Sequence, residues 1–175
     1  MPKTPAFCLF LSQLVFTACG QGSRPVPGSS AAYDQLLRTL YRNTVPTVQP
    51  AALAQELRQP IVPLLLDVRT PAEYKVSHLQ DARFVNSDSL QTQDFVGVDR
   101  ARPVVVYCSV GVRSERLGER LQALGFQHVR NLYGGLFEWV NEDHEVYNAQ
   151  GLTQNVHPYS ALWSPWLRQG RKVYE

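Results

Sequence analysis

Apolar residues of this chain form short strand-like runs that alternate with helix-like patterns. The runs lie at 61–68, 84–85, 104–107 and 128–132, and the helical patterns lie at 71–75, at 114–124 and after 134–135. Such alternation predicts an α/β fold with a parallel sheet, because parallel strands need a crossover between them. The run Val104-Val105-Val106 is apolar on both sides of its strand, which predicts a central strand with helices on both faces of the sheet.

Local signals indicate where two of the helices begin and end. Thr70 is followed by Pro71 and Glu73, the pattern of a capping box with proline in the first turn. In the helix at 114–124, the predicted buried stripe is Leu117, Leu121 and Leu124. Gly125 is the expected stop of this helix.

Two further short helices are predicted before the alternating region. Tyr33, Leu37 and Leu40 belong to a helical pattern over 33–41 that stops before Pro46. The second helix, Pro50 to Arg58, begins with proline.

The first eighteen residues have the layout of a secretion signal. Lys3 precedes an apolar run over 6–16, which is too short to cross about 30 Å of hydrocarbon as a helix. The junction Phe-Thr-Ala-Cys-Gly at 16–20 resembles the lipobox of bacterial lipoproteins, which implies lipidation of Cys19. An ordinary signal, cleaved nearby without lipidation, is the alternative. Gly20 replaces the Asp typical of inner-membrane lipoproteins, so we expect a lipid-anchored protein of the bacterial cell envelope, at the outer membrane and facing the periplasm.

The remaining chain is expected to divide into four parts. These are a Gly-, Ser- and Pro-rich tether at 19–30, a helical extension at 31–47, a domain at 48–147 and an aromatic tail at 148–175. The tail carries Tyr159, Trp163 and Trp166. It is expected to fold back over apolar surface, and a docking strip for a protein partner is the alternative.

The charge and the cysteine content of the chain limit the partners and cofactors that we expect. Seventeen Lys and Arg balance fifteen Asp and Glu with no basic run, so nucleic acid is not an expected partner. The three cysteines include no Cys-x-x-Cys pair, and His128 and His144 have no companions at ligand spacing. We therefore assign neither a metal nor a cofactor. Cys8 would leave with the signal and Cys19 would carry lipid, which leaves one thiol, Cys108.

The position of Cys108 in the sequence is typical of an active-site residue in an α/β fold. It follows the strand at 104–107 and precedes a loop into the next helix, so we expect it at the carboxyl end of a parallel strand. A loop curling there turns backbone N–H groups inward, the helix adds its positive end, and Arg113 adds a full charge. These features would stabilise a nucleophilic thiolate. The alternative is a buried core cysteine, a common environment for this residue.

Four separated motifs resemble the rhodanese family in order and spacing. They are Leu-Asp-Val-Arg-Thr-Pro-Ala-Glu-Tyr at 66–74, His-Leu-Gln-Asp-Ala at 78–82, Val-Val-Tyr-Cys-Ser-Val-Gly-Val-Arg-Ser at 105–114, and Tyr-Gly-Gly at 133–135 with Trp139. The resemblance implies the rhodanese-like three-layer fold. Ser77 and Asp81 stand where the family commonly has glycine, which puts the backbone shape of that loop in question.

The resemblance implies a thiosulfate sulfurtransferase-type enzyme. Cys108 would take a sulfane sulfur from a small donor, thiosulfate-like or a persulfide, and hold it as a persulfide. A thiol or cyanide acceptor would then receive the sulfur. The loop residues that would bind the substrate are Ser109, Val110, Gly111, Val112, Arg113 and Ser114.

Individual roles follow from the same resemblance. Arg113 would attract and orient an anionic donor, and a salt bridge to a neighbouring carboxylate is its alternative. Asp67 and Arg69 are expected to fix the architecture of the site by pairing, and not to react. His78 is expected to be a structural loop residue and not a base.

Three other functions were weighed. Rhodanese-like phosphatases need five residues between Cys and Arg, whereas Arg113 is itself the fifth residue after Cys108, so phosphatase activity is disfavoured. A dithiol oxidoreductase would need a second thiol close to the first. A lipid-tethered binding or sulfur-carrier module without turnover remains the main alternative, since fold alone does not decide function.

Overall fold

The structure, a computed structural model, describes residues 31–86 and 92–174. The expected signal peptide, the tether and the lipidation site Cys19 lie outside the described residues. Within the two described ranges, no helix has both the length and the hydropathy needed to cross a membrane.

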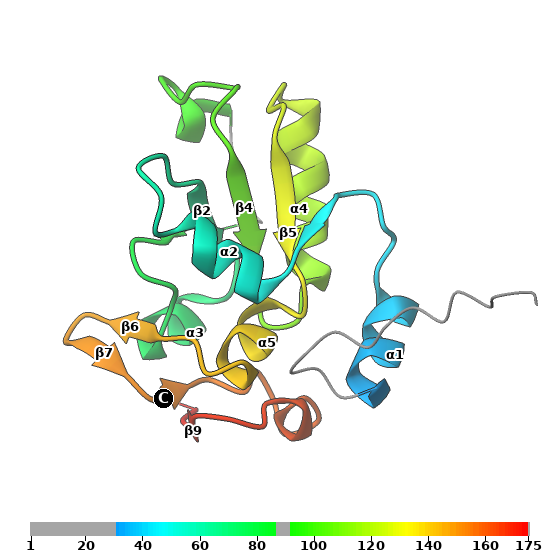
Figure 1. The fold of residues 1–175 in the computed structure, drawn as a ribbon, viewed down its shortest axis with the longest axis vertical. Coiled ribbons are helices and arrows are strands. Elements are labelled where there is room, and N and C mark those ends of the chain that lie inside the picture. The colour runs from blue at the N-terminus through cyan, green and yellow to red at the C-terminus, as the bar shows by residue number, and fades with distance from the viewer. Residues whose placement is uncertain (1–30, 87–91, 175) are drawn as a thin grey trace, which may run out of the picture.

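A parallel sheet forms the centre of the molecule (Figure 1). Its strands are β1 (Thr47–Val48), β2 (Leu64–Asp67), β3 (Arg83–Phe84), β4 (Val104–Tyr107) and β5 (Val129–Leu132). They lie in the order β1-β5-β4-β2-β3, with every neighbouring pair parallel. The α/β class and the central position of β4 are therefore confirmed.

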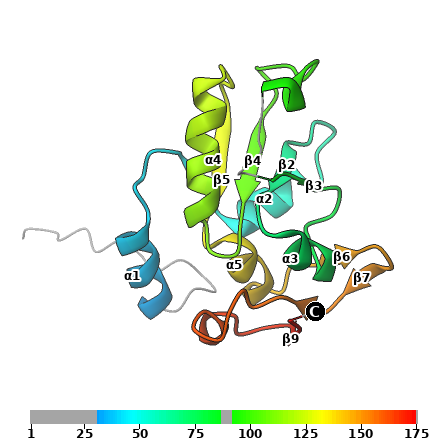
Figure 2. The same cartoon turned by 180° about the vertical axis from the view of Figure 1, so that it is seen from behind.

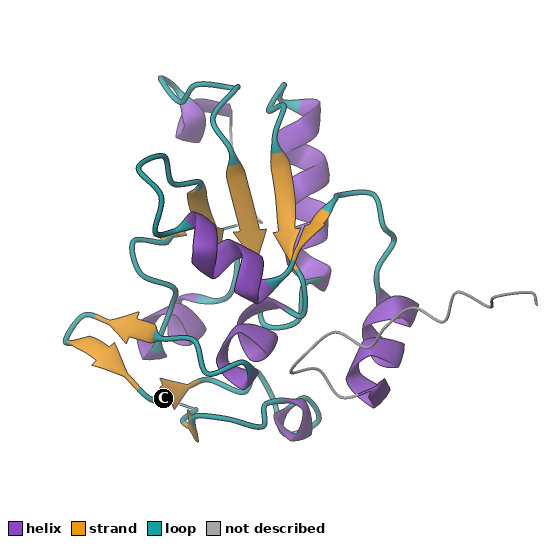
Figure 3. Cartoon of the chain, viewed as in Figure 1, coloured by secondary structure: helices purple, strands orange, loops and turns teal. Residues whose placement is uncertain are grey.

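Helices cover both faces of the sheet, which confirms the three-layer arrangement. The α-helices of the described residues are α1 (Ala31–Leu40), α2 (Pro50–Glu56), α3 (Pro71–Val76), α4 (Val112–Ala123) and α5 (Gly135–Asn141). Figure 3 shows α2 in front of the sheet with α4 on the opposite side, and Figure 2 shows the same molecule from behind, with α4 toward the viewer.

Successive residues of the strands pack into two different apolar cores, one on each face of the sheet. Val105 on β4 packs into one core with Leu53 of α2 and Leu136 of α5. Its neighbour Val106 packs into the other core with Leu117 of α4. Because successive strand side chains point to opposite faces, a strand with no polar position serves both cores.

Two strand predictions differ from the structure. β2 begins at Leu64 and not at Ile61, which is 79% exposed. Pro63 has no N–H to offer a neighbouring strand, and the first ladder bond is donated by Leu64. The pattern also missed β1, a two-residue strand that pairs with β5 and makes it an interior strand.

The C-terminal residues fold back onto the domain. Leu167 is fully buried, and Trp166 stacks on Tyr33 of α1 with ring centroids 5.5 Å apart. The segment contains the hairpin β6 (Val146–Asn148) and β7 (Gly151–Thr153), and the parallel pair β8 (Asn155–Val156) and β9 (Arg171–Lys172). The structure thus shows the packed arrangement of the tail.

Candidate functional site

Cys108 lies directly beyond the carboxyl end of β4, at the edge toward which the strands of Figure 1 point. Asp67 ends β2 and pairs in register with Tyr107, so the segments after these two strands meet at the same edge. Parallel sheets gather their loops in this way at one edge.

In the loop after β4, four consecutive backbone carbonyls accept hydrogen bonds from residues outside the loop. Cys108 and Ser109 accept hydrogen bonds from the N–H groups of Leu136 (2.8 Å) and Phe137 (3.0 Å) at the start of α5. Val110 accepts from the Tyr41 hydroxyl at 2.7 Å, and Gly111 accepts from the Asn131 side-chain amide at 2.8 Å. Because C=O and the following N–H are antiparallel in a trans peptide, outward carbonyls direct the next amides to the opposite side.

One of these amides contacts the sulfur. The N–H of Gly111 donates to Sγ of Cys108 at 3.1 Å, while the cysteine is only 1% exposed. Gly111 has φ of 99°, a conformation that favours glycine, and a Cβ added there would come within 2.1 Å of the Tyr41 hydroxyl. Cys108 is therefore buried, but a backbone donor faces its sulfur. This hydrogen bond distinguishes Cys108 from a core cysteine that is surrounded only by aliphatic side chains.

Arg113 forms an ion pair with Glu73 on α3. Its Nη2 and Nη1 donate to the carboxylate at 2.9 and 3.1 Å, and Nη2 also donates to the hydroxyl of Ser109 at 3.1 Å. The salt bridge considered as an alternative for Arg113 is thus present. Its side chain is still 31% exposed, so the ion pair leaves part of the Arg113 side chain in contact with solvent.

Glu73 carries a perturbed charge in this cluster. Burial acts to raise its pKa, but hydrogen bonds from Arg113, Ser109 and the Thr70 backbone prevail and hold the pKa at about 2. Burial likewise acts to lower the pKa of Arg113, yet Glu73 and the Cys108 sulfur together raise it. Both groups therefore stay charged at neutral pH.

Asp67 and Arg69 form a buried bidentate pair. Nε and Nη2 of Arg69 donate to the two carboxylate oxygens at 3.0 and 2.7 Å, and neither side chain is exposed. Nη2 also donates to the backbone oxygen of Ser77. This pair joins the end of β2 to the segment after α3. Its role is therefore structural.

The other loop residues lie mostly inside the protein. Ser109 donates through its hydroxyl to Glu73 at 2.6 Å, and Ser114 donates to Asn131 at 2.7 Å. Val110 is buried, and Val112 begins α4 two residues before the predicted start. These side chains support the loop, so contact with a small ligand would come mainly from its backbone.

His78 packs as a structural residue. Its ring stacks on Tyr74 at 4.0 Å between centroids, and Nδ1 lies 2.9 Å from the Tyr74 backbone oxygen. Nearby Asp81 has φ of 57°, so it adopts the left-handed conformation that glycine adopts most readily.

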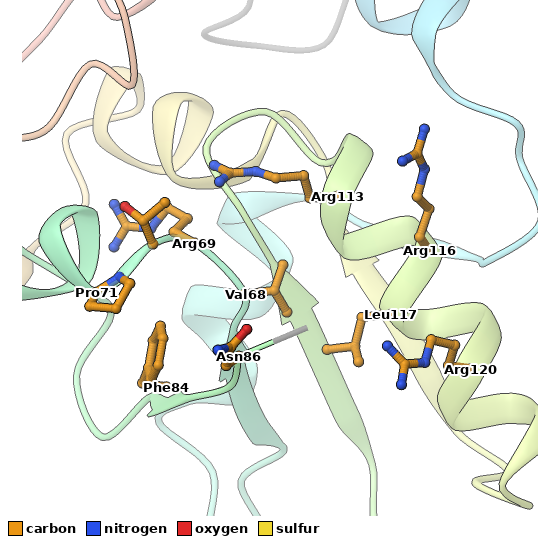
Figure 4. A pocket seen from close by; sticks show the side chains of 10 residues that line it. Val68, Arg69, Pro71, Phe84, Asn86, Arg113, Arg116, Leu117 and Arg120 are labelled. Atoms are coloured by element: carbon orange, nitrogen blue, oxygen red, sulfur yellow. The ribbon is translucent and has the colours of Figure 1, made fainter. Parts of the chain in front are cut away.

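A cavity of about 570 Å³ lies beside the loop. Figure 4 shows Arg113, Arg116 and Arg120 along α4, with the Arg113 side chain extending toward Arg69. Pro71 and Phe84 form part of the opposite wall. The charged lining favours anions.

Three contributors to the site were missed by sequence analysis. Glu73 was interpreted only as a capping residue, and Tyr41 only as part of a helical pattern. Asn131 gave a usable signal, because asparagine is depleted in strands and this one occupies a buried position of β5. Its side chain links Ser114 to the Gly111 carbonyl.

The profile described as "Rhodanese-like domain" matches residues 49–142. Among curated proteins, the chain is 32% identical over 120 residues to a tRNA uridine(34) hydroxylase of Pectobacterium atrosepticum, which covers 61% of this chain and 33% of that protein. A protein of the same name from Yersinia pestis is 32% identical over 94 residues, covering 51% and 25%. The chain thus spans about a third or less of these relatives.

Solved structures show the same fold. The BH2092 protein of Bacillus halodurans superposes with a TM-score of 0.55 at 21% identity, covering 69% of this chain and 86% of that one. A thiosulfate sulfurtransferase of Pseudomonas aeruginosa superposes with a TM-score of 0.53 at 26% identity, covering 59% of this chain and 19% of that one.

Proposed function

This chain belongs to the rhodanese-like family, and on that premise we propose that it is a sulfurtransferase that carries sulfur on Cys108. The observation that carries the proposal is the hydrogen bond from the Gly111 N–H to the cysteine sulfur. A donor in this position stabilises negative charge on Sγ, and therefore the Cys108 thiolate that would act as the nucleophile.

The proposed reaction has two displacements. The Cys108 thiolate attacks the outer sulfur of thiosulfate, the S–S bond of the donor breaks, and sulfite leaves with the electron pair. Cyanide or a thiolate then attacks the outer sulfur of the Cys108 persulfide. With cyanide, thiocyanate leaves and the Cys108 thiolate is restored.

Arg113 has a defined place in this reaction. Its ion pair with Glu73 fixes the guanidinium, and Glu73 and the Cys108 sulfur together raise the pKa of Arg113 against the effect of burial. A fixed cation next to the nucleophile attracts an anionic donor and favours the anionic persulfide. The same arrangement serves a persulfide donor, so the proposal includes both donors.

The proposal covers sulfur transfer at this domain alone. The tRNA reaction in the names of the curated relatives is not carried over, because this chain spans about a third or less of their length. We further propose that the protein acts at the cell envelope, attached by lipid at Cys19.

A mass measurement tests the function. The full chain with Cys8→Ser and Cys19→Ser keeps Cys108 as its single thiol; incubated with thiosulfate, it should gain one sulfur atom. Cyanide should remove this sulfur as thiocyanate, and Cys108→Ser should show neither event. If the chain forms neither adduct nor thiocyanate, the sulfurtransferase proposal is wrong and the binding module becomes the better interpretation.

A further inference from the structure

Tyr41 reaches the cysteine loop from outside the family domain. It follows α1, precedes residues 49–142 and is 8% exposed. Its hydroxyl donates to the Val110 carbonyl at 2.7 Å and accepts the N–H of Gly134 at 2.9 Å. Burial raises the pKa of Tyr41 well above its ordinary value, so the hydroxyl remains a donor at neutral pH.

The Val110 carbonyl and the Gly111 N–H belong to one peptide unit. Tyr41 holds the carbonyl, while the N–H donates to the Cys108 sulfur at 3.1 Å. Because the peptide is planar, its C=O and N–H turn together. A peptide that lost the Tyr41 donor could rotate to seek another partner, and that rotation would move the N–H off the sulfur.

The second hydrogen bond of Tyr41 joins the loop to the turn before α5. Gly134 starts the turn whose next amides, from Leu136 and Phe137, bind the carbonyls of Cys108 and Ser109. One hydroxyl therefore connects two of the segments that orient the loop. Gly111 allows this approach because a side chain there would collide with the hydroxyl.

We propose that Tyr41 is a positioning residue for sulfur transfer, whose hydroxyl keeps the Gly111 N–H directed at the Cys108 sulfur. The inference rests on the proposed function and makes the N-terminal extension part of the active site. Two other groups interact electrostatically with the sulfur: the cation of Arg113, itself paired with Glu73, and the buried phenol of Tyr33, whose hydroxyl donates to the Gly134 carbonyl.

Tyr133 provides a matched control. Its hydroxyl binds Asp34 of α1 at 2.8 Å, and its ring meets the Tyr41 ring edge-on at 5.9 Å. Tyr133→Phe thus removes one phenolic hydrogen bond to the same extension and leaves the Val110 contact. Tyr41→Phe removes the hydroxyl from the loop and keeps the ring.

The test compares both variants in the full chain with Cys8→Ser and Cys19→Ser. The alkylation rate of Cys108 by iodoacetamide is measured against pH. Tyr41→Phe should raise the pH of half-maximal rate by about one unit, the effect of losing one hydrogen bond to an anion. It should also lower kcat for thiosulfate about tenfold with little change in KM, while Tyr133→Phe matches the parent.

The outcomes of this test distinguish a failure of the Tyr41 proposal from a failure of the proposed function. Equal alkylation profiles for the two variants would contradict the proposal. So would a Tyr41→Phe chain that fails to fold while Tyr133→Phe folds, because the hydroxyl would then serve the fold as a whole. Failure of the parent chain to take up sulfur would contradict the proposed function instead, and the alkylation profiles would still decide the role of Tyr41.

Discussion

At the scale of single residues, Glu73 combines two roles. Its carboxylate accepts the Thr70 N–H at 2.9 Å, while the Thr70 hydroxyl accepts the Glu73 N–H, which completes the predicted capping box. The same carboxylate holds Arg113 and Ser109. The capping box at the start of α3 thus also positions the carboxylate that binds Arg113 and Ser109.

Glu73 should make stability depend on acid pH. Its pKa in the folded chain, about 2, lies below the ordinary 4.5, so the unfolded chain binds more protons between these values. The stabilisation is complete above the ordinary pKa and is lost as pH falls toward 2, by about 3 kcal/mol at most.

Urea denaturation at pH 7, 5, 4 and 3 measures this loss. Glu73→Gln should be less stable at pH 7 and should lose less stability than the parent between pH 5 and pH 3. A variant with the same pH dependence as the parent would show that Glu73 is not the group responsible.

Gly111 offers a second residue-scale prediction. Gly111→Ala places a Cβ 2.1 Å from the Tyr41 hydroxyl at φ of 99°, whereas Gly125→Ala meets nothing within 4 Å at φ of 89°. Backbone strain costs about 1 kcal/mol in both, and only Gly111→Ala adds the collision. We expect Gly111→Ala to lose sulfur uptake and at least about 2 kcal/mol of stability.

Gly125→Ala, at the other end of α4, serves as the control and should retain sulfur uptake. Mass measurement of the thiosulfate adduct and urea denaturation give the two results. Equal losses in both variants would mean that backbone strain alone, and not contact with Tyr41, makes glycine necessary at 111.

At the scale of elements, the C-terminal segment after the family domain supports both α5 and the site. Asn141 of α5 donates to the Trp166 carbonyl at 3.0 Å and accepts the Arg168 N–H at 2.7 Å. Tyr159 places its ring 4.7 Å from the Arg113 guanidinium carbon. The C-terminal segment therefore reaches from α5 to the site.

Packing of this segment predicts a stability difference between two leucines. Leu167 is fully buried, so Leu167→Ala should destabilise by about 2–5 kcal/mol. Leu162 is 79% exposed in the same segment, and Leu162→Ala should stay within about 0.5 kcal/mol of the parent. Similar urea midpoints for the two variants would contradict a packed tail.

At the scale of the whole molecule, the lipid anchor that we propose at Cys19 would decide where the protein works. Expressed in a Gram-negative bacterium, the parent chain should fractionate with the outer membrane, because the proposed lipid chains at Cys19 would hold it there. Cys19→Ser should move it away from the membrane fraction, whereas Cys8→Ser should not. If Cys19→Ser leaves the distribution unchanged, lipid at this cysteine is not the anchor.

The elements that the sequence predicts correctly have local determinants. The strand β4, the capping box before α3, and the turn of Gly134 into α5 depend on neighbouring residues, and all three were predicted. The strand β1 was missed because two residues between Pro46 and Pro50 show no periodicity, and pairing with β5 alone makes them a strand.

The sequence by itself determined the fold class and the motif that joins Cys108 to Arg113, because apolar periodicity and close spacing lie within short segments. Only the tertiary structure decided what surrounds that motif. Val110 meets Tyr41 from 69 residues away, and Arg113 meets Glu73 from 40 residues away. Partners at such distances are chosen by how the layers pack, and no local pattern records that choice.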